Sequence, residues 1–234
     1  MGNFFSIFFK RKMIGIDIGT SAIKIVELSR VGNTKVLENY VEFKLPAVDG
    51  KSVPNNNGVT PPSLEYLSLA IKEMLSEAHI KTKSVIFSIP DFSTFCTSFE
   101  IPAMTKEEIP GAILYNASQY ITLPISEVTL DWQITPTLPN DKNSPLKVFL
   151  VAVPNQIIED YKAIAKGAGL QMYALEAEVL GITRALIKNN ITGGAVKKTI
   201  CLIDIGAKSS TISIVDAGSV KTSYSFSFNA SHLT

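Results

Sequence analysis

The stretch that decides the fold is Met13–Leu28, which reads M-I-G-I-D-I-G-T-S-A-I-K-I-V-E-L. In its first half isoleucine alternates with glycine or aspartate, which is the period-two pattern of a strand with one buried face. Gly19-Thr20-Ser21 interrupts the apolar pattern, which then resumes and continues to the end of the stretch. The stretch therefore predicts two antiparallel strands joined by a tight turn.

The predicted turn has the chemistry of an anion-binding site. Gly19 allows the backbone to approach a ligand closely, while Thr20 and Ser21 offer hydroxyl and amide donors. Lys24 adds a positive charge just after the turn, and Asp17 places a carboxylate just before it. Because a carboxylate repels phosphate, the pattern favours a divalent cation between the two. The alternative is that Asp-x-Gly simply ends a strand and binds nothing.

The same pattern returns at Leu202–Val215, L-I-D-I-G-A-K-S-S-T-I-S-I-V, where Asp204 takes the place of Asp17. Two such hairpins would hold the phosphates of one nucleotide from both sides. A third strand is expected after each hairpin, at Thr34–Lys44 and at Ser219–Phe228. This recurrence indicates duplication of a ribonuclease-H-like α/β unit with helices packed on its sheet.

Between the two hairpins the sequence changes character. Apolar residues at three- and four-residue spacing predict a helix from about Ser63, and a short apolar run predicts the strand Ser84–Ile89. From about Asp91 to Leu170 the expected order becomes strand, helix, strand, strand and helix. This change of order indicates an inserted α+β subdomain.

Within the predicted insert, Thr105 and Glu108 have capping-box spacing, so we expect a helix from there to about Ile121. A second helix is expected after the insert, from Glu176 to Asn190. The other elements expected in this region are strands at Ser98–Ile101, Val128–Thr137 and Leu146–Pro154 and a helix from Asn155 to about Gly167.

Composition excludes several classes of protein. The 234 residues, 46% of them hydrophobic, suffice for one large or two small domains. The 22 basic and 21 acidic residues nearly cancel, which argues against nucleic-acid binding. Cys96 and Cys201 form no C-x-x-C pair, so we expect buried, reduced thiols in a cytosolic protein. No apolar run approaches the roughly 20 residues of a membrane span.

The first twelve residues, M-G-N-F-F-S-I-F-F-K-R-K, differ from the rest in placing an apolar run before three basic residues. Basic residues near anionic lipid contribute about 1 kcal/mol each, so residues 4–12 would support peripheral contact with a membrane. The alternative is a leader that packs loosely on the fold.

The two Asp-Ile-Gly hairpins are the pattern of the actin-like ATPase superfamily, and the sequence resembles its PilM branch, the cytoplasmic actin-like component of type IV pilus assembly. The resemblance to FtsA, the cell-division relative, is weaker. The segments that are similar to PilM proteins are Ile101–Ile113, Gln119–Ile134, Phe149–Tyr161 and Ala168–Leu186.

The resemblance implies an α/β fold: an actin-like, ribonuclease-H-like domain with an inserted SHS2-like α+β subdomain. It divides the chain into a leader (1–12), a first domain (13–90 and 171–198), the insert (91–170) and the start of a second domain (199–234). PilM proteins continue well beyond Thr234, where they supply the adenosine-binding loop. We therefore expect this chain to bind ATP poorly and to be inactive, whether it is naturally short or trimmed.

The resemblance also assigns roles to residues, with ATP and Mg2+ as cofactors. Asp17 and Asp204 would hold the metal ion through water, in the manner usual for magnesium. Glu176 would orient water as the catalytic residue, with an ordinary acid at a helix N-terminus as the alternative. The residues expected to bind the phosphates are Gly19, Thr20, Ser21 and Lys24 on one side and Gly206, Ala207 and Lys208 on the other.

By the same resemblance, the function expected is that of an adaptor of a type IV pilus, or of a related secretion or competence system, at the inner face of the bacterial inner membrane. It would bind the cytoplasmic N-terminal tail of a PilN-like membrane protein between the first domain and the insert, alongside other pilus platform proteins. ATP turnover would be weak at most. Two alternatives stay open: an FtsA-like membrane-tethered filament protein, and a small-molecule kinase, for which no substrate motif is found.

Overall fold

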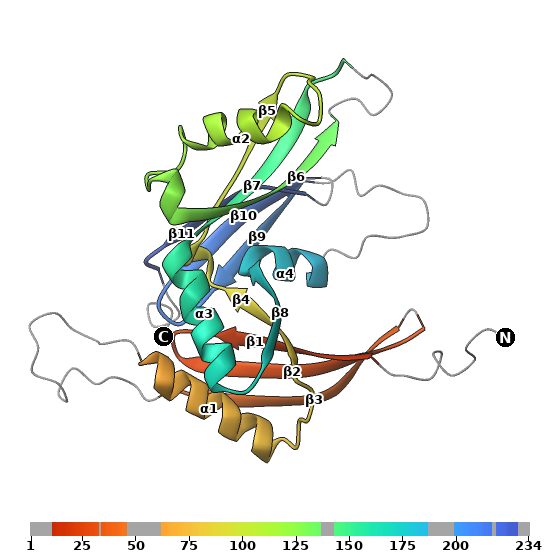
Figure 1. Cartoon of the computed structure of the whole chain (residues 1–234). Helices are drawn as coiled ribbons and strands as arrows, with labels where there is room; N and C mark the ends of the chain where they lie inside the picture. The colour runs from red at the N-terminus through yellow and green to blue at the C-terminus, as the bar shows by residue number, and fades with distance from the viewer. Residues whose placement is uncertain are drawn as a thin grey trace, which may run out of the picture. The chain divides into compact units, whose positions relative to one another are not determined.

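The structure is a computed structural model, and it describes residues 11–32, 34–45, 62–136, 143–186, 199–216 and 219–228 (Figure 1). The chain divides into two compact units. The first comprises Met1–Ser88 and Glu159–Glu176, and the second comprises Ile89–Ile158 and Ala177–Thr234. Most of the predicted leader, residues 1–10, lies outside the described residues.

A five-stranded mixed sheet organises the first unit, in the order β3-β2-β1-β4-β8. β1 pairs with β2 in antiparallel fashion and with β4 in parallel, and β2 pairs with β3. The predicted three-strand meander is therefore confirmed. The strands are β1 (Arg11–Ile18), β2 (Ala22–Val31), β3 (Thr34–Lys44), β4 (Ser84–Ile89) and β8 (Gln171–Ala177).

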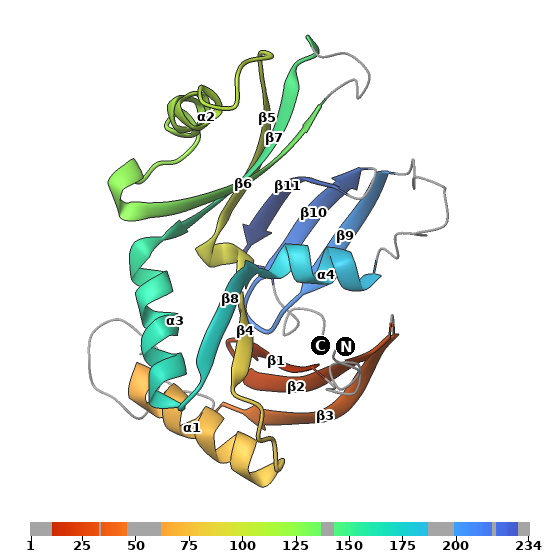
Figure 2. The same ribbon diagram turned by 45° about the vertical axis from the view of Figure 1, so that its right-hand side comes forward.

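Helices α1 (Leu64–Glu77) and α3 (Asn155–Gly167) lie side by side against this sheet, as Figures 1 and 2 show. The Ser68 hydroxyl donates to the carbonyl of Leu64 at 2.7 Å, and a Cβ on Gly167 would lie only 2.6 Å from that hydroxyl oxygen. The two helices can approach closely here because position 167 has no side chain.

The core of the first unit includes the isoleucines of the opening stretch. Phe87 on β4 is fully buried and meets the ring of Tyr161 on α3 edge-on, with 5.4 Å between ring centroids. The predicted helix start is also confirmed, since the Ser63 hydroxyl accepts a hydrogen bond from the amide of Tyr66. The fully buried aliphatic residues of this unit include Ile14, Ile16, Ile23, Ile25 and Ile71.

The second unit contains two three-stranded antiparallel sheets. The first has the order β5-β7-β6 and is covered by α2, whose Ile113 and Ala117 are fully buried against it (Figure 2). It confirms the strand–helix–strand–strand order predicted for the insert. Its elements are η2 (Asp91–Ser93), β5 (Phe95–Ile101), α2 (Ile109–Ala117), η3 (Ile125–Glu127), β6 (Val128–Pro136) and β7 (Leu146–Pro154).

The other sheet of this unit has the order β11-β10-β9 and repeats the opening meander, as predicted. Val215 and Val220 of this sheet form one buried cluster with Cys96 of β5 and Val179 of α4. Its elements are β9 (Thr199–Ile205), β10 (Ser210–Asp216) and β11 (Ser219–Phe226), with α4 (Glu178–Leu186) preceding them.

Three local predictions are wrong. The helix expected from Thr105 begins only at Ile109, because Pro110 has no amide hydrogen to bond to the preceding turn. Glu108 instead accepts hydrogen bonds from the amide and the hydroxyl of Thr105, both at 2.9 Å.

The helix expected from Glu176 begins two residues later, at Glu178. Of the two thiols expected to be buried, Cys201 is exposed.

Candidate functional site

The first hairpin turn is as tight as the sequence predicts. The Gly19 amide donates to the carbonyl of Ala22 at 2.9 Å, which closes the hairpin around Thr20 and Ser21. A Cβ on Gly19 would lie 3.1 Å from that carbonyl oxygen. A side chain at position 19 would therefore require this neighbour to shift by a few tenths of an ångström. Both residues at the tip are exposed to solvent.

The second hairpin repeats this geometry. The Gly206 amide donates to the carbonyl of Ser209 at 3.0 Å, around the exposed residues Ala207 and Lys208. A Cβ on Gly206 would lie 2.7 Å from the Ser209 oxygen, which is closer than real contacts allow. The two predicted phosphate turns are therefore built alike, one in each unit of the chain.

Asp17 is held in position by its neighbours on the first sheet. The Ser88 hydroxyl donates to one carboxylate oxygen of Asp17 at 2.9 Å, and Lys24 Nζ lies 4.0 Å from the other. Lys24 stands opposite Asp17 in the antiparallel register of β1 and β2. Because Lys24 is largely exposed, this ion pair is weak and the amine can also reach an anion at the turn.

Asp204 has a different setting. Thr211 stands opposite it on β10, in the position that corresponds to Lys24, and the Thr211 hydroxyl lies 2.9 Å from that of Ser225. Asp204 lines a small cavity of about 170 Å³ together with Thr211 and the buried carboxyl group of Asp91. That Asp17 and Asp204 bind one metal ion stays a prediction.

Asp91 is a candidate site residue that the sequence analysis missed. Its carboxylate accepts a hydrogen bond of 3.0 Å from the amide of Val179, at the first turn of α4. The pKa of Asp91 is raised to about 6, chiefly by burial and also by the charge of Asp204, against the lowering effect of that hydrogen bond. A single aspartate at the end of a predicted strand gives no signal in the sequence that a helix 88 positions away will meet it.

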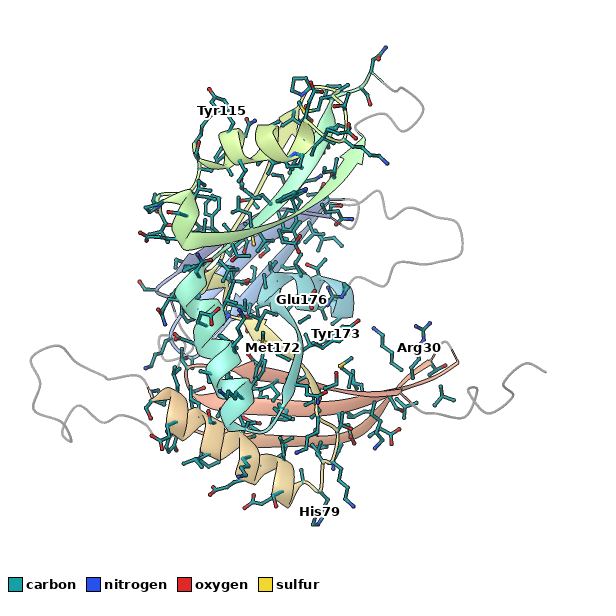
Figure 3. The ribbon with its side chains drawn as sticks, viewed as in Figure 1. Arg30, His79, Tyr115, Met172, Tyr173 and Glu176 are labelled. Carbon is teal, nitrogen blue, oxygen red and sulfur yellow. The ribbon has the colours of Figure 1, made fainter. Side chains whose placement is uncertain are left out.

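Glu176 lies on β8, not at a helix N-terminus as expected (Figure 3). The alternative explanation of Glu176 as a helix-terminal acid is therefore wrong. Its side chain is half-buried, and its neighbour Tyr173 on the same strand is largely exposed. The catalytic role of Glu176 stays a prediction.

The described residues contain no group of three or more histidine, cysteine, aspartate or glutamate side chains that could hold a metal ion. A magnesium ion that binds nucleotide needs only one or two carboxylates, because phosphates and water complete its shell. No helix in the described ranges is long and apolar enough to cross a membrane.

The insert carries an apolar pocket on its own surface. This pocket has a volume of about 250 Å³ and lies beside η2 and the segment that follows α2. Phe92 is 56% exposed at its rim, and Tyr120 stacks on Phe99 with 5.7 Å between ring centroids. The apolar residues that line the pocket include Phe92, Phe95, Tyr120, Ile121, Leu123 and Pro154.

The five-stranded mixed sheet, the paired Asp-Ile-Gly hairpins and the insert define a protein of the actin-like ATPase fold. A family model described as type IV pilus assembly protein PilM matches residues 15–228, so the chain belongs to the PilM family. The resemblance inferred from the sequence is confirmed.

Two solved structures illustrate the likeness. The PilM–PilN type IV pilus biogenesis complex matches with a TM-score of 0.77 and 22% identity, over 95% of this chain and 63% of that chain. The cytoplasmic domain of EpsL, an inner-membrane component of the type II secretion system of Vibrio cholerae, matches with a TM-score of 0.57 and 11% identity. That match covers 93% of this chain and 71% of the EpsL chain. The chain thus spans 63% of the length of the PilM chain that it matches.

Proposed function

We propose that this protein is a nucleotide-binding adaptor of the type IV pilus assembly platform, and that it binds the cytoplasmic N-terminal tail of a PilN-like inner-membrane protein. The observation that carries the proposal is the family match over residues 15–228. The similar structure of a PilM–PilN complex supports the choice of partner. The place of action would be the inner face of the bacterial inner membrane, with other platform proteins nearby.

The apolar pocket of the insert, beside Phe92 and Tyr120, is the proposed site for this tail. An extended peptide has few ordered contacts of its own, so its affinity must come from a few apolar side chains that enter pockets. Phe92 and Leu123 are 56% and 43% exposed at this pocket, although each is large and apolar. Their burial by a partner would be favourable at about 25 cal/mol per Å² of apolar surface.

We propose that the two hairpins bind the phosphates of ATP with Mg2+. The residues fit this pair of ligands, since each turn exposes its tip residues to solvent and follows a strand that carries an aspartate. Carboxylate oxygens of Asp17 and Asp204 suit magnesium, which would neutralise phosphate charge when bound. Ser88 orients the carboxylate of Asp17, and the turn amides and hydroxyls would donate to phosphate oxygens.

The residues proposed to act on nucleotide are those that the sequence analysis assigned. Glu176 would orient the water that attacks ATP. The ATP turnover proposed is weak at most. The segment 4–12 would add peripheral membrane contact near the tail and so raise the effective concentration of the tail. Residues 4–10 of that segment lie outside the described part of the chain.

The experiment that tests the function is a titration of a fluorescently labelled N-terminal tail peptide of the PilN-like protein with this chain, followed by anisotropy. Saturable binding that a scrambled peptide of the same composition does not reproduce is the expected result. Equal binding of the scrambled peptide, or no binding, would contradict the proposal.

A further inference from the structure

A third cavity in the second unit differs in character from the pocket of the insert and from the small cavity beside Asp204. It has a volume of about 570 Å³ and is lined by residues of β5, β6, β7, α4 and β11. Cavities of about 300–1,000 Å³ are typical of small-molecule sites. None of the predicted phosphate-binding or metal-binding residues lines it.

The charges around this cavity favour an anion. Lys147 on β7, Arg184 on α4 and Lys221 on β11 contribute three cations, against the single carboxylate of Glu100. Lys147 Nζ lies 3.9 Å from the Glu100 carboxylate, and both side chains are about half-exposed, so this ion pair is weak. Within the described ranges Lys221 forms no ion pair. The three cations come from three different elements and line the same cavity.

A buried hydroxyl group also lines the cavity. Thr183 on α4 is only 6% exposed, and its Oγ1 has no hydrogen-bond partner among the described residues. A threonine inside a helix usually bonds to the carbonyl four residues earlier, here that of Val179. A buried polar group without a partner is costly, so a ligand oxygen or nitrogen that bonds to Thr183 would be favoured.

The rest of the lining is partly apolar and partly polar, the polar residues being Ser98, Gln133 and Ser219. Phe149, Leu180 and Val220 are among its apolar residues: Val220 belongs to the buried cluster around Cys96, and the partly buried Phe149 and Leu180 pack against that cluster. We propose that this cavity is a binding site for a small phosphorylated molecule with a flat apolar body, of the nucleoside monophosphate class. The phosphate contacts Lys221, Lys147 and Arg184, the Thr183 hydroxyl donates to it, and the base lies against Phe149.

The test is calorimetry of this chain with a panel of the four ribonucleoside monophosphates, with the matching uncharged nucleosides and with inorganic phosphate. We expect at least one monophosphate to bind more tightly than both its nucleoside and free phosphate. Lys221→Gln and Thr183→Val should each weaken that binding by about fivefold or more, the loss expected for one hydrogen bond to a charged group. The matched control is Lys106→Gln, which removes an exposed cation elsewhere in the same unit.

Three results would overturn the proposal. The first is that no monophosphate binds. The second is that binding is lost in Lys24→Gln but retained in Lys221→Gln, which would place the nucleotide at the first hairpin. The third is that an acidic peptide binds in a manner sensitive to Lys221 while the monophosphates do not, which would make the cavity a peptide site. Far-ultraviolet circular dichroism of each variant checks that it is folded. If Thr183→Val does not fold, the Lys221→Gln variant alone tests the proposal.

Discussion

The hydroxyl of Ser88 donates to the carboxylate of Asp17 at 2.9 Å, and the two residues are partners in the parallel register of β1 and β4. The carboxylate at the mouth of the first hairpin is thus oriented by a strand that lies 71 residues further along the chain. A carboxylate that is already oriented loses less freedom when it meets a hydrated metal ion. Ser88 is therefore expected to strengthen the binding of a metal–phosphate ligand at the first hairpin, although Ser88 lies outside the turn.

We predict that Ser88→Ala weakens binding of magnesium pyrophosphate at the hairpin by about three- to tenfold, since one hydrogen bond of this kind contributes about 1 kcal/mol. The measurement is a titration followed by the NMR shifts of the Gly19, Thr20 and Ser21 amides. Ser84→Ala on the same strand is the control and should leave the titration unchanged. Equal affinity in Ser88→Ala and the wild type would show that Asp17 needs no such support.

The two turn glycines should differ in their tolerance of alanine. A Cβ at position 206 would lie 2.7 Å from a backbone oxygen, whereas one at position 19 would lie 3.1 Å from its nearest atom. We predict that Gly206→Ala lowers the free energy of unfolding by about 1–3 kcal/mol, as overpacking does, and Gly19→Ala by less. Urea unfolding checks this.

Gly111→Ala is the matched control for the turn glycines. Gly111 lies in α2, and a Cβ there would meet no atom within 4 Å. Alanine is favoured over glycine in a helix by about 1 kcal/mol, so this variant should be as stable as the wild type or more stable. A Gly206→Ala protein as stable as Gly111→Ala would contradict the crowding seen at the second turn.

The local part of the fold could be predicted from the sequence, and the long-range part could not. Ser63 marks the start of α1 because a helix cap depends on residues only three positions away. Glu176 was assigned to a helix because the strand β8 is defined by pairing with β4, a sheet partner far away in the sequence. Asp91 was missed for the same reason, since its hydrogen-bond donor is on α4.

The buried carboxyl group of Asp91 should make stability depend on pH. Its pKa is about 6 in the folded protein, above the value of about 4 in an unfolded chain, so the folded state binds its proton more tightly. The stabilisation from this group is complete below about pH 4 and is lost as the pH rises through about 6. A shift of two pKa units corresponds to about 3 kcal/mol.

We predict that Asp91→Asn removes this pH dependence, because asparagine can still accept the hydrogen bond from Val179 but carries no charge. The free energy of unfolding of the variant, relative to that of the wild type, should be higher at pH 7.5 than at pH 5. Urea unfolding at the two pH values measures it. Asp131→Asn, which changes an exposed aspartate, is the control. If Asp91→Asn lowers the free energy of unfolding equally at both pH values, the charge on Asp91 does not destabilise the folded protein, and the prediction is wrong.

The adaptor function is best tested without removing the insert. Residues 91–170 include α3, whose Tyr161 and Ile164 belong to the buried core, so deletion of this segment would also damage the first unit. Single substitutions at the rim of the apolar pocket avoid this problem. Phe92 is suitable because it is 56% exposed, and Tyr115 on α2, 71% exposed and outside the pocket, is its control (Figure 3).

The decisive measurement is the dissociation constant of the labelled PilN-like tail peptide for the wild type, Phe92→Ala and Tyr115→Ala proteins. An aromatic side chain at the centre of an interface commonly contributes about 2 kcal/mol or more. The account predicts that Phe92→Ala weakens the complex by about tenfold or more and that Tyr115→Ala binds like the wild type. Equal affinity of all three folded proteins would contradict the account, because the tail would then bind without the pocket of the insert.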